Sequence, residues 1–110
     1  MFIKLATLDP KYLEDAKNVL IEATKRAPTE AKLFYNLGLL YARTHEVDTA
    51  ITILKKTVIM KPNYRDARLA LAYLYIDKHM NQEAKGELNY ILQKIDPDDT
   101  ISKTQLEELK

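Results

Sequence analysis

The 110-residue sequence has no cysteine or tryptophan, only two glycines, and no long apolar run. The missing cysteine excludes disulfide bonds and thiolate chemistry but leaves the cellular compartment open. A membrane-spanning helix needs about 18 consecutive apolar residues, and the longest apolar stretches here, such as residues 37–42, are far shorter. Residues 1–8 are too few for a signal peptide and contain no small-residue cleavage site. We therefore expect a soluble protein and favour the cytoplasm.

A strong charge of either sign is also missing. The formal net charge is +1, and the apolar and charged fractions of 46% and 30% are ordinary for one globular domain. Residues 31–95 carry ten Lys and Arg against six Asp and Glu, whereas residues 96–110 carry two against five. A nucleic-acid groove would need clustered cations and a far more basic composition. The charge distribution therefore argues against nucleic acid as a partner.

The sequence contains none of the common catalytic motifs. There is no glycine-rich phosphate loop, no serine nucleophile elbow and no histidine–glutamate metal motif. The acidic residues Asp96, Asp98 and Asp99 lack the glycine and distal glutamate of a calcium loop, so we interpret them as helix-capping charge. Further carboxylates fall among lysines at helical spacing, as on a solvated helix face: Glu14, Asp15, Glu22, Glu83 and Glu87. We expect no catalysis, no cofactor and no metal ion.

What the chain does contain is an internal repeat of 34 residues. Its pattern is Phe34-x2-Leu37-Gly38-x2-Tyr41, then Ala50-x3-Leu54, then Pro62. Shifting residues 31–64 onto residues 65–98 aligns six identical pairs: Leu37 with Leu71, Leu40 with Leu74, Tyr41 with Tyr75, His45 with His79, Ala50 with Ala84 and Leu54 with Leu88. The second copy departs at Arg68, which replaces Phe34, and at Pro97, which comes one residue late. We interpret the late proline as one extra residue at the end of the preceding helix.

A partial copy precedes these two units. Ala16-x3-Leu20-x2-Ala23 and Pro28 repeat the spacing of the second half of a unit, which suggests that the chain starts inside a repeat. We expect a single domain over residues 1–110, made of a partial repeat at 9–30 that consists of a second helix, complete repeats at 31–64 and 65–98, and a capping helix at 99–110.

Apolar periodicity and proline punctuation predict helices over residues 9–26, 30–43, 48–60, 64–78 and 82–95, and a short last helix over 102–109. Asp9 before Pro10 is typical of a helix N-terminus. Asn63 and Asn81 are candidate N-caps, and Ser102 with Gln105 is a candidate capping box.

Two histidines, His45 and His79, lie one period apart in the predicted turns between paired helices. Histidine is enriched among the non-glycine residues that adopt a positive φ, which explains its use in such a turn. A metal site is the alternative, but two histidines without further ligands make a poor one.

Small residues stand where paired helices must approach closely, at Gly38 and Ala72 and at Ala50 and Ala84. Gly86 lies in the middle of a predicted helix, where glycine costs about 0.5–1 kcal/mol relative to alanine. Close helix packing and neutral substitution are both open as its explanation.

The period, the small residues, the tyrosines and the prolines between residues 5 and 97 resemble those of the tetratricopeptide repeat. The resemblance implies an all-α fold, a right-handed α-α superhelix of about two and a half helical hairpins with a C-terminal capping helix. It further implies that the first helices line a concave groove that binds an extended peptide or a helix of a partner. The function it predicts is a protein–protein interaction scaffold, as a fragment or module of a larger protein.

Carried over by place in the repeat, the groove-facing residues of the first complete unit are Lys32, Tyr35, Asn36, Leu39 and Arg43. Those of the second are Asp66, Leu69, Tyr73, Ile76 and Asp77. The carboxylate clamp used by some members is not expected, because Ala70 stands where a cation is required and Asp66 would repel a carboxylate. Packing between adjacent units remains an alternative role for Leu39, Leu69 and Ile76.

The alternative function is a structural homo-oligomerisation unit. An incomplete array leaves an apolar N-terminal edge near Phe2, Ile3, Leu5 and Leu8, which a second copy or a parent chain would cover. The acidic loop and the helix that ends Leu106-Glu107-Glu108-Leu109 are similar to the soluble C-terminal repeats of some bacterial membrane polysaccharide ligases. That resemblance implies the soluble part of a bacterial membrane protein as another possible location.

Overall fold

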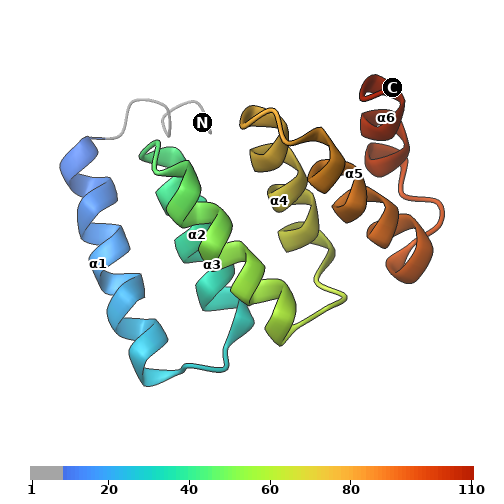
Figure 1. Ribbon diagram of the computed structural model, residues 1–110. Helices are drawn as coiled ribbons and strands as arrows, with labels where there is room; N and C mark the ends of the chain where they lie inside the picture. Colours follow the sequence, from blue (N-terminus) through green and yellow to red (C-terminus); the bar gives the residue numbers. More distant parts are fainter. Residues whose placement is uncertain (1–8) are drawn as a thin grey trace.

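The computed structural model describes residues 9–110, and in this range it contains six α-helices and no strand (Figure 1). They are α1 (Pro10–Arg26), α2 (Ala31–Arg43), α3 (Val47–Met60), α4 (Arg65–Asp77), α5 (Asn81–Tyr90), which continues into the π-helical turn η2 (Ile91–Ile95), and α6 (Thr100–Glu108). The predicted all-α fold is confirmed, and the predicted helices lie within about two residues of the observed ones. The predicted apolar edge near Phe2 and Leu5 lies outside the described residues.

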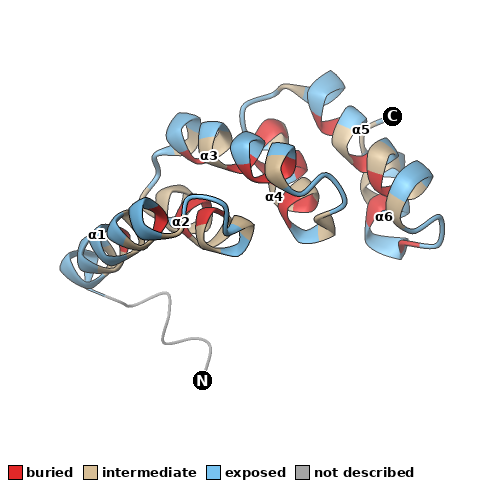
Figure 2. Ribbon diagram, turned by 90° about the horizontal axis from the view of Figure 1, so that it is seen from below, coloured by how far each residue is buried: buried red, intermediate tan, exposed pale blue. Residues whose placement is uncertain are grey.

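The helices form a row of stacked hairpins in which α2 packs on α3 and α4 packs on α5 (Figure 1). Helix α1 packs on α2 at one end of the row, and α6 packs on α5 at the other. Seen from below, α2, α4 and α6 lie on one side of the row, and α3 and α5 lie on the other (Figure 2). The alternation follows from the sequence repeat, because each hairpin alone would leave one apolar face in water.

The core is built from the small and aliphatic residues that recur with the repeat. Ala50, Leu54, Ala84 and Leu88 are completely buried. A Cβ atom on Gly38 would lie only 2.8 Å from Cγ of Leu54. The predicted close approach of α2 and α3 at this glycine is therefore confirmed.

The turns between paired helices take their shape from the two histidines. His45 and His79 have φ angles of 64° and 61°, and no other non-glycine residue among residues 9–110 has a positive φ. After each of them the next amide donates to a carbonyl five residues back, from Glu46 to Tyr41 at 2.9 Å and from Met80 to Tyr75 at 2.8 Å. These bonds satisfy carbonyl groups that the helix end would otherwise leave unpaired. The predicted turn role of the histidines is confirmed.

The extra residue before Pro97 is accommodated by a change of helix type. The last turn of the second helix, Ile91–Ile95, is π-helical, and the amide of Asp96 donates to the carbonyl of Ile91 at 2.8 Å. A π turn holds one more residue than an α turn. The predicted insertion is confirmed. Residues after the π turn therefore correspond to residues 35, and not 34, positions earlier in the chain.

The helix caps differ in part from those predicted. Asp9 accepts a hydrogen bond from the amide of Lys11 at 2.8 Å, as its place before Pro10 indicates. The capping box at Ser102 is wrong, because α6 begins two residues earlier and is capped by the carboxylate of Asp99. Asn63 and Asn81 are not N-caps either, because the N-cap residue of α4 is Tyr64 and that of α5 is Met80. The carboxamide of Asn63 instead accepts from the hydroxyl of Tyr90 at 3.2 Å.

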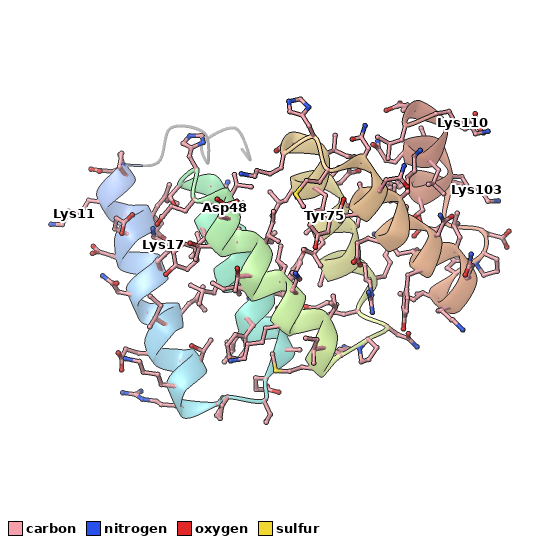
Figure 3. The ribbon with its side chains drawn as sticks, viewed as in Figure 1. Lys11, Lys17, Asp48, Tyr75, Lys103 and Lys110 are labelled. Carbon is pink, nitrogen blue, oxygen red and sulfur yellow. The ribbon has the colours of Figure 1, made fainter. Side chains whose placement is uncertain are left out.

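Lys17 joins α1 to the rest of the row. Its ammonium contacts Glu14 at 2.8 Å, Glu46 at 2.5 Å and the hydroxyl of Thr44 at 3.2 Å, and it lies 4.8 Å from the ring centre of Tyr41. Figure 3 shows this side chain directed from α1 toward its neighbours. The side chain of Lys17 is buried, whereas its partner Glu14 is exposed, as expected of a carboxylate on a solvated helix face.

Candidate partner-binding face

Helices α2 and α4 lie side by side and carry a shallow hollow of about 230 Å³ between them. Its lining consists of Tyr35, Leu39, Asp66, Leu69, Ala70 and Tyr73. Five of these residues were predicted from the repeat to face a groove. The structure brings them together because residues spaced by three or four along each helix share one face.

A second hollow of about 820 Å³ opens at the end of α2 nearest the histidine turn. It contains the predicted residues Asn36, Leu39, Arg43 and Asp77, together with apolar side chains from α1, α2 and α4. Lys32 does not join either hollow. It lines a separate depression near the end of α3.

The hydrophobic members of the predicted set differ in exposure. Leu69 is buried, and Ile76 is partly buried against the core, so both residues contribute to packing between helices. Leu39 is partly exposed and lines both hollows. Tyr73 is 41% exposed, which makes it the most accessible aromatic side chain of this face.

An aromatic pair supports the central hollow. The rings of Tyr35 and Tyr64 have centroids 5.1 Å apart with a 41° tilt, and the ammonium of Lys61 lies 4.7 Å from the centre of the Tyr64 ring. Burial raises the pKa of Tyr35, and the nearby charge of Asp66 raises it further. Tyr35 therefore keeps its hydroxyl proton at neutral pH. Tyr64 was not predicted from the sequence, because its place before α4 has no aromatic counterpart one period earlier.

A third hollow of about 280 Å³ extends the face onto α6. Tyr73 lines it together with Thr100, Ile101, Thr104 and Gln105. Tyr73 thus stands between two hollows, and Ile101 is exposed at the far side. Sequence reasoning did not predict the α6 residues of this hollow. They could have been found by aligning the start of α6 with the start of α4 at a spacing of 35 residues, which includes the extra residue of the π turn.

An ion pair fixes α6 beside α4. Nε of Arg65 donates to Oδ2 of Asp99 at 2.7 Å, and a second guanidinium nitrogen donates to Oδ1 at 3.1 Å. The same carboxylate accepts from the amide of Ser102 at 3.2 Å, at the start of α6. Hydrogen bonds from Arg65 hold the pKa of Asp99 below its ordinary value. One buried carboxylate therefore caps α6 and attaches it to α4.

The composition of this face is mainly aromatic and aliphatic. Among residues 9–110, no three His, Asp or Glu side chains are grouped as they would be around a metal ion. Within the same residues, every helix is too short or too polar to span a lipid bilayer. The face offers aromatic and aliphatic surface with a few polar groups at its margin, the composition found at protein contact sites.

No family model matches the chain, and no curated protein matches it significantly by sequence. Solved structures do match. A thermophilic TPR protein of Thermus thermophilus is 30% identical with a TM-score of 0.80, over 90% of this chain and 50% of that one. The type III secretion translocator chaperone SycD of Yersinia enterocolitica is 20% identical with a TM-score of 0.77, over 90% of this chain and 80% of that one. MamA is 23% identical with a TM-score of 0.68, over 88% of this chain and 52% of that one.

The chain thus spans about half the length of the Thermus protein. At their level of identity, SycD and MamA show the fold alone. The 34-residue pattern, the stacked hairpins and the likeness to the Thermus protein agree with one another. The chain has the fold of the tetratricopeptide-repeat proteins.

Proposed function

We propose that this protein is an interaction scaffold that binds an extended segment or a helix of a protein partner across the face formed by α2, α4 and α6. The observation that carries the proposal is the position of Tyr73, 41% exposed between the mainly apolar central hollow and the more polar hollow shared with α6. Tyrosine supplies a large contact area and a hydroxyl at little cost in conformational entropy, and it is enriched at binding hot spots.

The ligand that fits this face carries apolar side chains at intervals. One apolar group enters the central hollow beside Tyr35 and Leu39, and another reaches Ile101 on the far side of Tyr73. The walls carry few charges, so recognition rests on apolar contact, with Asp66 accepting a hydrogen bond at the margin. A catalytic role is not part of the proposal.

The name of one structural neighbour supports the same class of function. SycD is a type III secretion translocator chaperone. The likeness is one of fold, so it supports scaffold function and not a particular ligand. The chain is also proposed to act as a module of a larger protein, which is compatible with its coverage of half the Thermus protein.

A peptide library displayed on phage tests the proposal directly. Selected peptides are expected to share spaced apolar residues and to bind Tyr35→Ala/Tyr73→Ala more weakly by about tenfold or more, since hot-spot truncations cost about 2 kcal/mol. Tyr12→Ala is the matched control, because Tyr12 is a 60% exposed tyrosine on α1. Selected peptides that bind the double variant as tightly as the wild type would contradict the proposed face.

A further inference from the structure

Aromatic rings in this protein repeatedly hold a cation of the chain itself. The head group lies 3.6–4.8 Å from the ring centre in each of these pairs: Lys17 with Tyr41, Lys56 with Phe34, Lys61 with Tyr64 and Arg68 with Tyr90. The negative face of an aromatic ring attracts the cation. Tyr35 and Tyr73 both line the central hollow between α2 and α4, yet no cation of residues 9–110 lies over either ring.

A carboxylate lies at the margin of the same hollow. Among the residues that line the hollow, Asp66 alone carries a charge, and its side chain is 58% exposed. Oδ1 of Asp66 accepts a hydrogen bond from Arg65 at 3.0 Å, whereas Oδ2 has no side-chain donor among the described residues. One oxygen of this carboxylate is therefore available to a ligand.

The neighbouring cations do not cancel the charge of Asp66. Arg65 is matched by the buried carboxylate of Asp99, to which its Nε donates at 2.7 Å. Lys61 lies over the ring of Tyr64 and does not line the hollow. Burial is the main cause of the raised pKa of Tyr35, and the charge of Asp66 raises that pKa more than the charge of Arg65 lowers it. The electrostatic balance at the hollow is therefore negative.

The remaining walls of the hollow are apolar. They are formed by Leu39, Leu69 and Ala70. The volume of about 230 Å³ has room for about eight water molecules at ~30 Å³ each, and hence for one long side chain. Lysine and arginine lay an aliphatic stem along apolar surface and direct the charged head to a polar group. Arginine suits two tyrosines and a carboxylate better, because its planar guanidinium stacks on rings while its N–H groups donate.

The chain contains one complete example of this arrangement. The guanidinium of Arg68 lies 3.6 Å from the ring centre of Tyr90 and donates to Glu87 at 3.0 Å. That group joins a tyrosine ring, a guanidinium and a carboxylate. The central hollow holds the tyrosines and the carboxylate of such a group without the guanidinium.

We propose that the central hollow binds an arginine side chain of the partner segment. The inference rests on the proposed function and specifies the group that enters the hollow. The aliphatic stem contacts Leu39, and the guanidinium lies against Tyr35 and Tyr73. The guanidinium also donates to the free oxygen of Asp66. Because a second group of the ligand reaches Ile101, the segment carries arginine and an apolar residue on one face.

Peptides from a random phage library supply the probe. Sequences that bind the full chain are expected to contain an arginine at a fixed distance from an apolar residue. Each is then synthesised with citrulline in place of that arginine, which keeps the shape of the side chain and removes its charge. Citrulline should weaken binding by about tenfold in fluorescence anisotropy, because the cation–π contact and the charge-assisted hydrogen bond are lost.

A protein variant identifies the group that the arginine contacts. Asp66→Asn should weaken binding of the arginine peptide by about tenfold and leave the citrulline peptide nearly unchanged. The matched control is Asp77→Asn, which removes the same charge from an exposed position of α4 outside the hollow and should leave both peptides unchanged. Asp66 is mostly exposed and Arg65 retains Asp99, so Asp66→Asn is expected to fold, which circular dichroism checks.

Four results would overturn the proposal. The first is a set of selected peptides without arginine, and the second is a citrulline peptide that binds as tightly as its parent. The third is an equal loss in Asp66→Asn and Asp77→Asn, which would show only a diffuse attraction. The fourth is tighter peptide binding by Lys4→Gln, which would identify a cation of the chain itself as the occupant.

The same peptides separate this inference from the proposed function. Peptides that need Tyr35 and Tyr73 but no arginine leave the partner-binding face in place and remove the arginine site alone. Peptides that bind Tyr35→Ala/Tyr73→Ala as tightly as the wild type contradict the face and the arginine site together.

Discussion

The two complete repeats build the same contact from exchanged residues. In the first repeat, the ammonium of Lys56 on α3 lies 4.8 Å from the ring centre of Phe34 on α2. In the second, the guanidinium of Arg68 on α4 lies 3.6 Å from the ring centre of Tyr90 on α5. One period relates Phe34 to Arg68 and Lys56 to Tyr90, so the aromatic ring and the cation have changed helices. The structure keeps the cation–π contact, whichever helix supplies each half.

The exchange changes what surrounds the contact. Arg68 also donates to Glu87 at 3.0 Å and to the carbonyl of Pro62 at 3.0 Å. The side chains of Arg68 and Glu87 are 13% and 18% exposed, so the interpretation of Glu87 as a residue of a solvated face is wrong. One period earlier the place of Glu87 is taken by Ile53. The second repeat therefore holds an ionic network where the first holds apolar packing.

Removing the cation from each repeat is expected to change the free energy of unfolding by the most different amounts. Arg68→Ala is expected to lower the free energy of unfolding by about 2–3 kcal/mol, because it leaves Glu87 largely buried without its partner. Lys56→Ala should cost about 0.5–1 kcal/mol, the value of an exposed cation–π contact. Urea denaturation measures both. Equal costs would show that the ionic network adds nothing to the ring contact.

The attachment of α6 to the second repeat gives the next largest effect. Asp99→Asn is expected to lower the free energy of unfolding by about 1–3 kcal/mol at pH 7, because it weakens both the helix cap and the pair with Arg65. Since the pKa of Asp99 is lowered in the folded protein, its contribution is present above the unfolded value of about 3.9 and is lost as the pH falls through the folded value.

A pH series of denaturation curves checks this prediction. The wild type should lose more stability than Asp99→Asn between about pH 5 and pH 2, so the two curves should converge in acid. A constant difference across that range would mean that Asp99 acts without its charge.

The two glycines provide a third contrast, of opposite sign. A Cβ atom added to Gly86 would meet no neighbouring group within 4 Å, which removes close packing as the explanation of this glycine. Gly86→Ala should therefore stabilise the protein by about 0.5–1 kcal/mol. Gly38→Ala should destabilise it, because its Cβ would contact Leu54. Thermal melting of both variants measures these changes in stability. A higher melting temperature for Gly38→Ala would refute the close packing of α2 on α3.

The smallest change is expected when the second repeat is converted to the chemistry of the first. The triple variant Arg68→Phe/Glu87→Ile/Tyr90→Lys should unfold within about 1 kcal/mol of the wild type, since apolar residues can replace a largely buried ion pair without net loss. Arg68→Phe alone should be clearly less stable than the triple variant. Additive effects of the three substitutions would show that the contact is not exchanged as a unit.

Local signals allowed most of the fold to be predicted from the sequence. Prolines, recurring leucines and the two histidines specify helices and turns within a few residues of themselves, and the late Pro97 even indicated the extra residue of the π turn. The contacts that escaped prediction join residues distant in the chain. Arg68 stacks on Tyr90, and Arg65 pairs with Asp99, because neighbouring helices bring them together.

The candidate site shows the same limit. Place in the repeat predicted Tyr35, Leu39 and Tyr73 on one face, and the structure assembles them around one hollow. Place in the repeat did not predict Tyr64 or Ile101. The position of Tyr64 depends on the path of the loop before α4, and that of Ile101 depends on the shifted register of α6. Binding by these residues stays a prediction.

The π turn at Ile91–Ile95 has a consequence for how such chains lengthen. An extra residue in an α-helix would rotate every later side chain by about 100° around the axis and turn buried residues outward. Here the additional residue is absorbed within a single turn, so Ile95 at the end of that turn still packs against the core although the spacing has changed. Sequence period and spatial period are thereby uncoupled, and a repeat array can accept an insertion at a helix end without losing its stacking.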